Sequence, residues 1–567
     1  MGLSSALGIG RSALAAYQAA LQVVGHNIAN AGTPGYARNV ANLSAVPGAS
    51  LGVGQVGYGV TVTGVRRNVS EALNARLRTA GSNVQSSVAQ RDVMARIEGI
   101  FNPLGDTNLG SLMSEFFKTV GDLQNNPQNT ASRSMVTTSA GAVIDKIRSM
   151  RADLLSLRTD ANREIEVAVQ QADQLASQIA SLNVQISTAE ASSGGTAAGL
   201  RDQRDQLLGQ LSDLFEITVR EQPSGAINVY VGNDALIQFG ESFGLKTTTE
   251  IDANGLASVV VRYKHHNGPV DATSGRVPGL ITARDSYGQS QLDRLDAMAS
   301  ALIHEVNKLH ASGKGLQGFS SVTGTYAATD PSLALSTTGN GITFPPKTGS
   351  FFIDVKDNAT GVSTRHQIHI DLDGIGSDSS LNSVAADITA NVPGVTATVL
   401  ADGRLQLSAA AGSTFSFADD TSGFLAAVGV NTFFAGSTSR DIEINAVVKN
   451  NAAFLAAGKT DLPGDGSNAT DIAALQNKVV TALGASLNEY YASTVAEIAV
   501  TSASTQSASD AGAIVFESLT NQRESISGVN LDEEAISMIT YQRAYEGAAR
   551  YMTVVDEMLQ VLLGIVR

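Results

Sequence analysis

The strongest constraint on the fold is a repeat of apolar residues, spaced alternately three and four apart, at both ends of the chain. An α-helix drifts about 20° per heptad from a 3.5-residue repeat, so a repeat held this long predicts helices in supercoiled pairing. The C-terminal series comprises Leu531, Met538, Tyr541, Tyr545, Ala548, Met552, Val555, Leu559, Leu562 and Val566. The N-terminal series comprises Leu3, Leu7, Leu14, Tyr17, Leu21, Val24 and Ile28. We call these series the terminal seams, and they predict that the two ends pair with each other or with copies of the same chain.

Two residues interrupt the terminal seams. Gly10 stands at a seam position in the N-terminal series, and Glu534 stands at one in the C-terminal series. Gly8, Gly10 and Gly25 each cost roughly 1 kcal/mol relative to alanine within a helix, and an isolated helix of this length is already marginal. We therefore expect the N-terminal segment to become ordered only when something covers its apolar face. The alternative is that both seams belong to amphipathic helices of one ordinary bundle.

The composition restricts the partners and the chemistry that are open to the chain. Its 567 residues are 43% hydrophobic, which is enough for several buried cores. A formal net charge of −15 repels phosphate backbones and anionic lipids, so nucleic acid and membrane are poor partners. The chain has no cysteine, which excludes disulfides, thiolate metal sites and a cysteine nucleophile. No apolar run is long enough for a membrane span, and Met1–Gly10 lacks the basic start of a signal peptide, so we expect a cytoplasmic protein or one exported by another route.

The predicted fold is multidomain α+β, with a long helical bundle or coiled coil formed by both termini and the flanking helices. Helical periodicity dominates both flanks of the chain, and strand-like alternation dominates two stretches of the middle. These two stretches are predicted to be β-rich domains inserted into the bundle. The domains that we assign are a terminal coiled coil (1–40 with 528–567), a helical bundle (41–216 with 271–316 and 441–527), a first β-rich insert (217–270) and a second β-rich insert (317–440).

The pattern within these regions also predicts individual elements. An apolar stripe predicts one long helix that includes Val143–Ile186. Helix breaks are predicted near Asn102–Pro103, Asn126–Pro127 and Gly194–Gly195. Further expected elements are a strand hairpin over 51–66, a helix over Ser286–His310, and a helix from about Asp471 to the last residue.

A helix stop and a chain reversal follow the N-terminal seam. Gly32 is expected to end the helix in a left-handed conformation. Thr33 precedes a proline and is therefore predicted to be extended, and Pro34-Gly35 suits the two central positions of a type II turn. The segment from Asn27 to Tyr36 resembles the N-terminal signature of flagellar rod, hook and hook-associated proteins, which form the flagellar axial family. The residues that carry this resemblance are Asn27, Asn30, Thr33, Pro34, Gly35 and Tyr36.

The C-terminal stretch resembles the same family. Residues 527–534 read SGVNLDEE, and residues 541–545 read YQRAY. The residues that carry the resemblance here are Gly528, Asn530, Asp532 and Gln542. The GVNLDEE form is more similar to the hook-associated members than to the hook or rod members. Internal stretches at 200–219, 297–313 and 419–434 agree, so the resemblance covers most of the chain, although 317–415 does not match segment by segment.

The resemblance implies a structural subunit of the bacterial flagellum that forms a junction zone between hook and filament. It implies export of the unfolded chain through the flagellar type III channel, and therefore an extracellular location. The implied partners are copies of the chain in a ring-like zone, the hook protein on one side, the next hook-associated protein on the other, and an export chaperone at the C-terminal helix. In the family the terminal helices line the inside of the tube and the β modules face outward. Polar residues near the seam, such as Gln542 and Asp556, are predicted to set its register.

Two histidine-containing patterns resemble metal sites but lack the required spacing. His304-Glu305 begins a zinc hydrolase motif, but position 308 is a lysine instead of the second histidine. His366 is expected on the opposite face of a strand from His369, Asp371 and Asp373, and no calcium loop fits in either register. We therefore expect no metal at either place.

Three glycine-rich patterns resemble catalytic or nucleotide motifs. Gly52–Gly57 matches a phosphate-binding loop, and Gly48–Gly52 and Gly240–Gly244 match a serine nucleophile elbow. Each motif needs a helix directly after it, and strand-like sequence follows instead. We therefore expect no catalytic residue and no cofactor.

Other functions stay open from the sequence. Within the same family the chain could be a hook or distal rod protein, but the GVNLDEE form and the helical segment 140–215 argue against this. It could be a secreted enzyme on a flagellar scaffold, which the incomplete zinc motif disfavours. It could also be an adhesin, although no feature of the sequence indicates a ligand.

Overall fold

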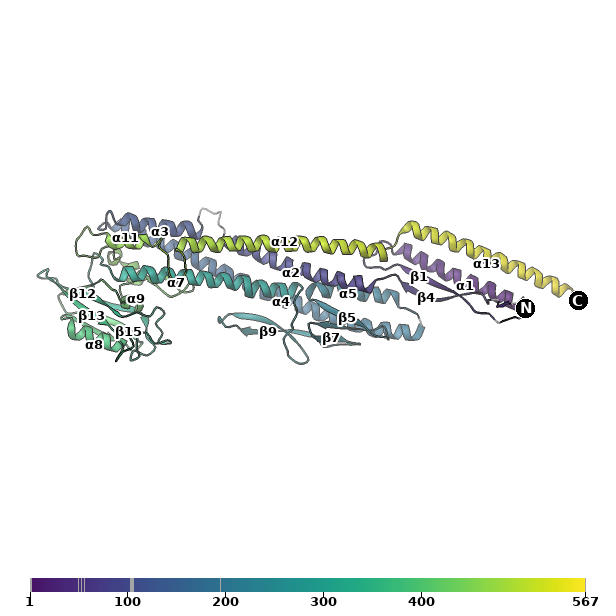
Figure 1. Cartoon of the computed structure of the whole chain (residues 1–567), viewed down its shortest axis with the longest axis horizontal. Coiled ribbons are helices and arrows are strands. Elements are labelled where there is room, and N and C mark those ends of the chain that lie inside the picture. The colour runs from purple at the N-terminus through teal and green to yellow at the C-terminus, as the bar shows by residue number, and fades with distance from the viewer. Residues whose placement is uncertain are drawn as a thin grey trace. The chain divides into compact units, whose positions relative to one another are not determined.

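The computed structural model describes residues 3–48, 50–51, 54–55, 57–101, 107–193 and 195–565, and it has the predicted α+β composition (Figure 1). The chain forms two compact units, each assembled from segments that are distant in sequence. The first unit contains residues 1–93, 159–284 and 503–567, and the second contains 94–158 and 285–502. The boundaries of these two units differ from those of the predicted domains, and the predicted domain boundaries stay a prediction.

Three long helices contribute to both units: α2 (Glu71–Phe101), α4 (Thr130–Ser193) and α12 (Leu487–Ser527). The stripe predicted for α4 is buried at every position, because intervals of three and four residues place these side chains on one helix face. The buried residues are Val143, Ile147, Met150, Leu154, Leu157, Ala161, Ile165, Ala168, Ala172, Leu175, Ile179, Leu182 and Ile186. Two predicted breaks are confirmed, between α3 (Leu109–Leu123) and α4 and between α4 and α5 (Ala198–Leu214), whereas the break at Asn102–Pro103 lies outside the described residues.

The first unit also holds the terminal helices α1 (Leu3–Ala29) and α13 (Leu531–Ile565), the helix α6 (Arg276–Thr282) and a small β module. In this module β5 (Ile217–Glu221), β6 (Ile227–Val231), β7 (Asp234–Gln238) and β8 (Glu241–Ser242) form an antiparallel sheet in that order. A separate hairpin pairs β9 (Leu245–Ile251) with β10 (Ala257–Tyr263). The buried residues Val229, Val231 and Ile237 form the inner side of the four-stranded sheet.

The second unit contains α3, α7 (Gln289–Ala311), α11 (Ser467–Ala474) and a larger β module with two three-stranded sheets. One sheet has the order β11 (Ser321–Ala327), β15 (Arg404–Ala409), β14 (Val395–Val399), and the other has the order β13 (Ser363–Ile370), β12 (Gly349–Asp357), β16 (Ser413–Ala418). Aromatic residues such as Phe351, Phe415 and Phe417 and the helix α8 (Leu381–Asn391) complete its core. Short elements finish the unit: α9 (Phe424–Ala427), β17 (Phe434–Ala435), β18 (Glu443–Ile444), α10 (Ala446–Asn450) and a 3-10 turn at Ala452–Phe454.

Several predicted boundaries are wrong. The hairpin expected over 51–66 begins earlier, since β1 (Asn39–Ala45) pairs with β4 (Val60–Arg67), and the short strands β2 (Ser50–Leu51) and β3 (Gly54–Gln55) lie between them. The helix expected over Ser286–His310 is α7, preceded by a π-helical segment at Ala283–Gly288. The helix expected from Asp471 onward is three helices, because a turn with a left-handed Gly484 follows α11 and a second stop separates α12 from α13. Among the described residues, no helix combines the length and the apolar character that crossing a bilayer would need.

His310, at the end of α7, connects three segments of the second unit. It is 1% exposed, its Nε2 accepts a hydrogen bond from the backbone N–H of Ala456 at 2.9 Å, and its Nδ1 lies 2.8 Å from the carbonyl oxygen of Asn431. Because Nε2 accepts, the ring is neutral and its proton is on Nδ1. Burial lowers the pKa of His310 to about 4, and the positive charge of Arg133 acts in the same direction.

We expect the unfolding free energy to decrease on acidification because of His310. Its folded pKa lies below the ordinary value of 6.5, so the folded state binds fewer protons, and this stability is complete above pH 6.5 and is lost as the pH falls toward 4. The loss over this interval is about 3 kcal/mol, at about 1.4 kcal/mol per pKa unit. Denaturant titrations at several pH values measure this loss. We expect the unfolding free energy of His310→Gln to depend less on pH than that of the wild type. The control His369→Gln, which changes an exposed histidine, should have the same pH dependence as the wild type. Equal pH profiles for wild type and His310→Gln would contradict the prediction.

Candidate functional site: the paired terminal helices

The two terminal helices pair with each other in antiparallel orientation (Figure 1). Asn27, near the end of α1, bonds Glu534, near the start of α13, whereas Gly10 lies against Met552 much further along α13. The hairpin of β1 and β4 also packs on α1. The first of the two pairings that the seams predict is therefore confirmed.

The buried face of α1 lies beside the predicted seam. The buried residues of α1 are Gly10, Ala16, Ala20, Val24 and Asn27. Of the N-terminal seam residues whose side chains the structure describes, only Val24 is among them, and Leu7, Leu14, Tyr17, Leu21 and Ile28 are half-buried. A side chain at Gly10 would overlap the Sδ of Met552, so the residue that interrupts the seam is the one that allows close approach there.

The C-terminal seam faces α1 along most of its length. Val555 is buried, and the half-buried seam residues are Met538, Tyr541, Ala548, Met552 and Leu559. The seam residues that remain exposed are Leu531, Tyr545 and Leu562. Val566 lies outside the described residues, as does the side chain of Leu3.

Glu534, which interrupts the C-terminal seam, is the polar centre of this site. Its side chain is 2% exposed, its Oε2 accepts a hydrogen bond from Asn27 Nδ2 at 2.9 Å, and its Oε1 accepts one from Arg38 Nε at 2.7 Å. Asn27 in turn accepts hydrogen bonds at Oδ1 from the Tyr36 hydroxyl at 2.7 Å and from the backbone N–H of Asn39 at 3.0 Å. The family-motif residues Asn27 and Tyr36 therefore position the acid that connects α1, β1 and α13. A lone carboxylate in an apolar seam is the sequence signal that could have indicated a buried partner.

The chain reversal after α1 is the predicted type II turn. Tyr36 N–H donates to the Thr33 carbonyl at 3.2 Å, and Gly35 has a φ of 81° at the third position of the turn. The left-handed conformation expected for Gly32 is wrong, since Gly32 has no positive φ. The chain instead continues in right-handed turns, with Asn30 Nδ2 donating to the His26 carbonyl at 2.9 Å and Thr33 N–H donating to the Asn30 carbonyl at 2.9 Å.

The motif residues at the other end shape the start of α13. The N–H of Gly528 still donates to the Glu524 carbonyl at 2.8 Å, which closes α12. Asn530 caps α13, because its Oδ1 accepts the N–H of Asp532 at 3.0 Å. Asp532 lies in the first turn, where the helix dipole favours a negative charge. Gln542 is exposed on α13, so its predicted role in setting a register stays a prediction.

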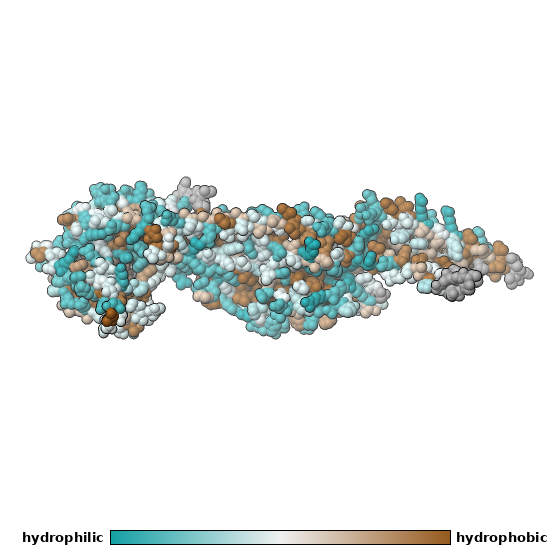
Figure 2. Space-filling model, in the orientation of Figure 1, coloured by the Kyte–Doolittle hydropathy of each residue, from teal (hydrophilic) through white to brown (hydrophobic). Residues whose placement is uncertain are grey.

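A second apolar face runs along α13, and α1 does not cover it. Figure 2 shows hydrophobic residues at the surface along the terminal region. The residues of this face, which we call the outer face, are between 47% and 66% exposed, and they are Ile536, Ile539, Val554, Met558 and Val561. The exposed Arg543 and Arg550 separate its two apolar groups, of which Val554, Met558 and Val561 form the larger, and exposed apolar residues gathered in this way mark a site of association.

An ion-pair cluster connects the β1–β4 hairpin to α5. Arg67, at the end of β4, donates to Asp202 Oδ1 at 2.8 Å and to Asp205 Oδ2 at 2.5 Å. Burial raises the pKa of the Asp202 carboxyl, and the charge of Arg67 offsets part of that rise. These residues carried no signal in the sequence, because their contacts span more than 130 positions.

The histidines of the patterns that resemble metal sites lie against other side chains or on the face of a strand. His304 stacks on Phe344 with ring centroids 4.6 Å apart, and burial lowers its pKa. In β13, His369 is exposed and His366 lies on the same face as the buried Ile368 and Ile370, as the alternation predicts. The phosphate-loop pattern falls partly outside the described residues.

One acidic cluster includes a residue that the sequence patterns missed. Carboxylate oxygens of Asp371, Asp373 and Asp378 lie within 4.8 Å of one another. Asp373 accepts the N–H of Ile375 at 2.8 Å, and Asp378 accepts that of Gly374 at 3.0 Å. Because these bonds shape an exposed turn, the cluster is explained without an ion.

Comparisons with known proteins agree over the whole chain. The family described as "Flagellar hook-associated protein FlgK helical domain" matches residues 94–324. The families described as "Flagella basal body rod protein" and "Flagellar basal body rod FlgEFG protein C-terminal" match residues 7–36 and 521–565. Flagellar hook-associated protein 1 of Salmonella typhimurium is 26% identical over 99% of this chain and 100% of its own length. Flagellar hook-associated protein 1 of Bacillus subtilis is 25% identical over 100% of this chain and 98% of its own length. The fold is similar to a solved structure, the flagellar hook junction protein FlgK from Burkholderia pseudomallei, with a TM-score of 0.53 and 15% identity over 80% of this chain and 100% of that one.

Glu534→Ala is expected to release α13 from α1. The change removes one acceptor each from Asn27 Nδ2, which still donates to the Asn39 carbonyl, and from the half-buried Arg38, which still pairs with the exposed Glu533, so we expect a cost of about 1–3 kcal/mol. The measurement is limited proteolysis at the termini, followed by mass spectrometry.

The matched control is the neighbouring Glu533→Ala. Glu533 pairs with the same Arg38 at 3.1 Å, but its side chain is 58% exposed, so its loss should cost no more than about 1 kcal/mol. Equal protection of the termini in both variants would show that the buried carboxylate does not hold the helices together.

Proposed function

Because the chain belongs to the family of flagellar hook-associated protein 1, we propose that it is a structural subunit of the bacterial flagellum that forms the junction zone between hook and filament. Its partners are copies of itself in a ring-like zone, with the hook protein on one side and the next hook-associated protein on the other. The family match over residues 94–324 supports this role over that of a hook or distal rod protein. As a structural subunit it needs no catalytic residue and no cofactor.

The observation that carries this proposal is the outer face of α13. One side of α13 packs on α1, and the outer face leaves residues such as Val554 and Val561 at 51% and 63% exposure. Full burial of each such side chain between copies would contribute roughly 1.5–3 kcal/mol at most. The half-buried seam residues of α1, among them Leu14 and Leu21, offer further surface that neighbouring copies can cover.

The same surface supports export with a chaperone. A free chain with an apolar helix face is prone to associate too early, so a chaperone at the C-terminal helix would cover that face until export. The absence of cysteine suits passage of an unfolded chain through the flagellar type III channel, because no disulfide has to be reduced. Its destination is then extracellular, at the hook–filament junction.

Deletion of the gene tests the junction role directly. We expect cells with bare hooks, and flagellin in the medium, since filament subunits would have no junction on which to assemble. The measurement is electron microscopy of the cells together with an assay of flagellin in the medium. Cells without hooks would indicate a rod or hook component instead, and normal flagella would contradict any role in the axial structure.

A charge on the outer face of α13 should abolish association without unfolding the chain. We expect Val554→Glu to block association of copies, because burying an unpaired carboxylate between them is strongly unfavourable. The far-ultraviolet circular dichroism should stay that of the wild type, since Val554 is 51% exposed. The measurements are analytical ultracentrifugation and complementation of motility in the deletion strain.

Thr553→Glu is the matched control, since it introduces the same charge at the neighbouring exposed position on the polar flank of α13. It should associate and restore motility as the wild type does. Normal association of Val554→Glu would mean that the outer face does not contact other copies.

A further inference from the structure

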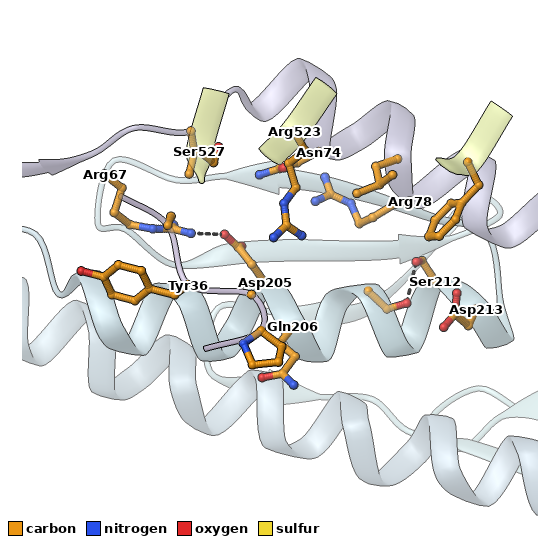
Figure 3. Close-up of a pocket in the computed structure, with 17 residues that line it drawn as sticks. Tyr36, Arg67, Asn74, Arg78, Asp205, Gln206, Ser212, Asp213, Arg523 and Ser527 are labelled. Atoms are coloured by element: carbon orange, nitrogen blue, oxygen red, sulfur yellow. Dashed lines mark hydrogen bonds and ion pairs between the residues drawn. The ribbon is translucent and has the colours of Figure 1, made fainter. Parts of the chain in front are cut away.

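A cavity of about 280 Å³ lies within the first unit, where the terminal segments meet the helical bundle (Figure 3). The turn residues Pro34 and Tyr36 form one side of it, and α2, α5 and α12 form the others. Leu77 and Phe516 contribute apolar wall. Together with β4, which contributes Arg67, five separate parts of the chain therefore form the lining of this cavity.

Three arginines line this cavity: Arg67 of β4, Arg78 of α2 and Arg523 of α12. Arg67 is bonded to Asp202 and Asp205, as described above. Arg78 and Arg523 are half-buried, and within the described part of the chain neither has an ion pair or a side-chain hydrogen bond. Figure 3 shows both side chains directed into the cavity from their helices.

The acids of the cavity do not neutralise these two arginines by direct contact. Asp205 Oδ2 accepts a hydrogen bond from Arg67 at 2.5 Å. Asp213 lies at the end of the cavity away from Arg67, where it and Phe516 both border Gly81 (Figure 3). Burial lowers the pKa of Arg78, and the negative charges of Asp205 and Glu71 offset only part of this change. Arg78 is therefore a cation whose lost hydration is not fully replaced.

We propose that this cavity is an oxyanion site in which Arg78 and Arg523 bind a carboxylate or a similar anion. Guanidinium groups are suited to this ligand, because their planar set of donors matches two oxygens of a carboxylate, sulfate or phosphate. The apolar wall at Leu77 and Phe516 strengthens the attraction, since it reduces screening by water. The anion is either a free inorganic ion or an acidic side chain of a second copy of this chain.

Binding of sulfate to the full-length chain tests the site. Thermal unfolding is measured in sulfate and in chloride at equal ionic strength. At a sulfate concentration ten times its Kd, the ratio of folded to unfolded chain should rise about elevenfold. Arg78→Gln and Arg523→Gln should each remove this effect and should still fold, because neither side chain has a hydrogen-bond partner within the described residues.

The matched control is Arg76→Gln, which removes the same charge from an exposed position of α2 two residues away, on another side of the helix. It should keep the sulfate effect. No sulfate effect in the wild type, or an equal effect in Arg78→Gln and Arg523→Gln, would overturn the proposal.

Measuring how copies of the chain associate in sulfate and in chloride distinguishes the two sources of the anion. This measurement rests on the proposed function, whereas the thermal unfolding measurement does not. If sulfate weakens association of the wild type but not of Arg523→Gln, the natural occupant is an acidic side chain of a neighbouring copy. If association is unchanged while sulfate still stabilises the chain through Arg78 and Arg523, the occupant is a free anion. Both results require the oxyanion site, so a failure of the assembly proposal leaves the thermal test intact.

Discussion

The terminal region depends on one buried carboxylate. Glu534 accepts hydrogen bonds from Asn27, 507 residues away in the chain, and from Arg38, and an unpaired charge at 2% exposure would cost several kcal/mol. The pairing of α1 with α13 is therefore fixed in one antiparallel register, because a shift by one residue would separate the acid from both donors. Tyr36 and Asn39 hold Asn27 in place, so the turn after α1 and the first strand are part of the same constraint.

Local physics made much of the fold predictable from the sequence. The stripe from Val143 to Ile186 defined the buried face of α4, since helix periodicity alone decides which side chains share a face. Pro34-Gly35 defined a type II turn, because proline fixes one dihedral angle and glycine permits a positive φ at the next position. The sequence shows that Glu534 interrupts the seam but not which residues pair with it, since the partners of this buried acid come from distant segments.

Long-range packing decided what the sequence could not indicate. In α1 the small residues Ala16 and Ala20 are the buried ones, because both α13 and the β1–β4 hairpin pack on this helix, and the larger Leu14 and Leu21 lie at the side. A repeat of apolar residues identifies a helix face that can be covered, but not which part of it the same chain covers. The ion pairs of Arg67 with Asp202 and Asp205 were unpredictable for the same reason, since nothing in their local sequence indicates a partner.

The outer face of α13 and the half-buried side of α1 belong to one physical design. A helix that carried apolar residues only toward its partner would form a closed pair, and its remaining surface would be polar. In α13, however, Val554, Met558 and Val561 form a second apolar series beyond the polar flank, and the half-buried seam residues of α1 are uncharged. Glu534 therefore defines how the termini of one chain pair, whereas the uncovered apolar series is the surface that we propose other copies cover. Under this proposal folding and assembly are separate, because the buried polar network fixes the first and apolar area that stays free until a neighbour covers it drives the second.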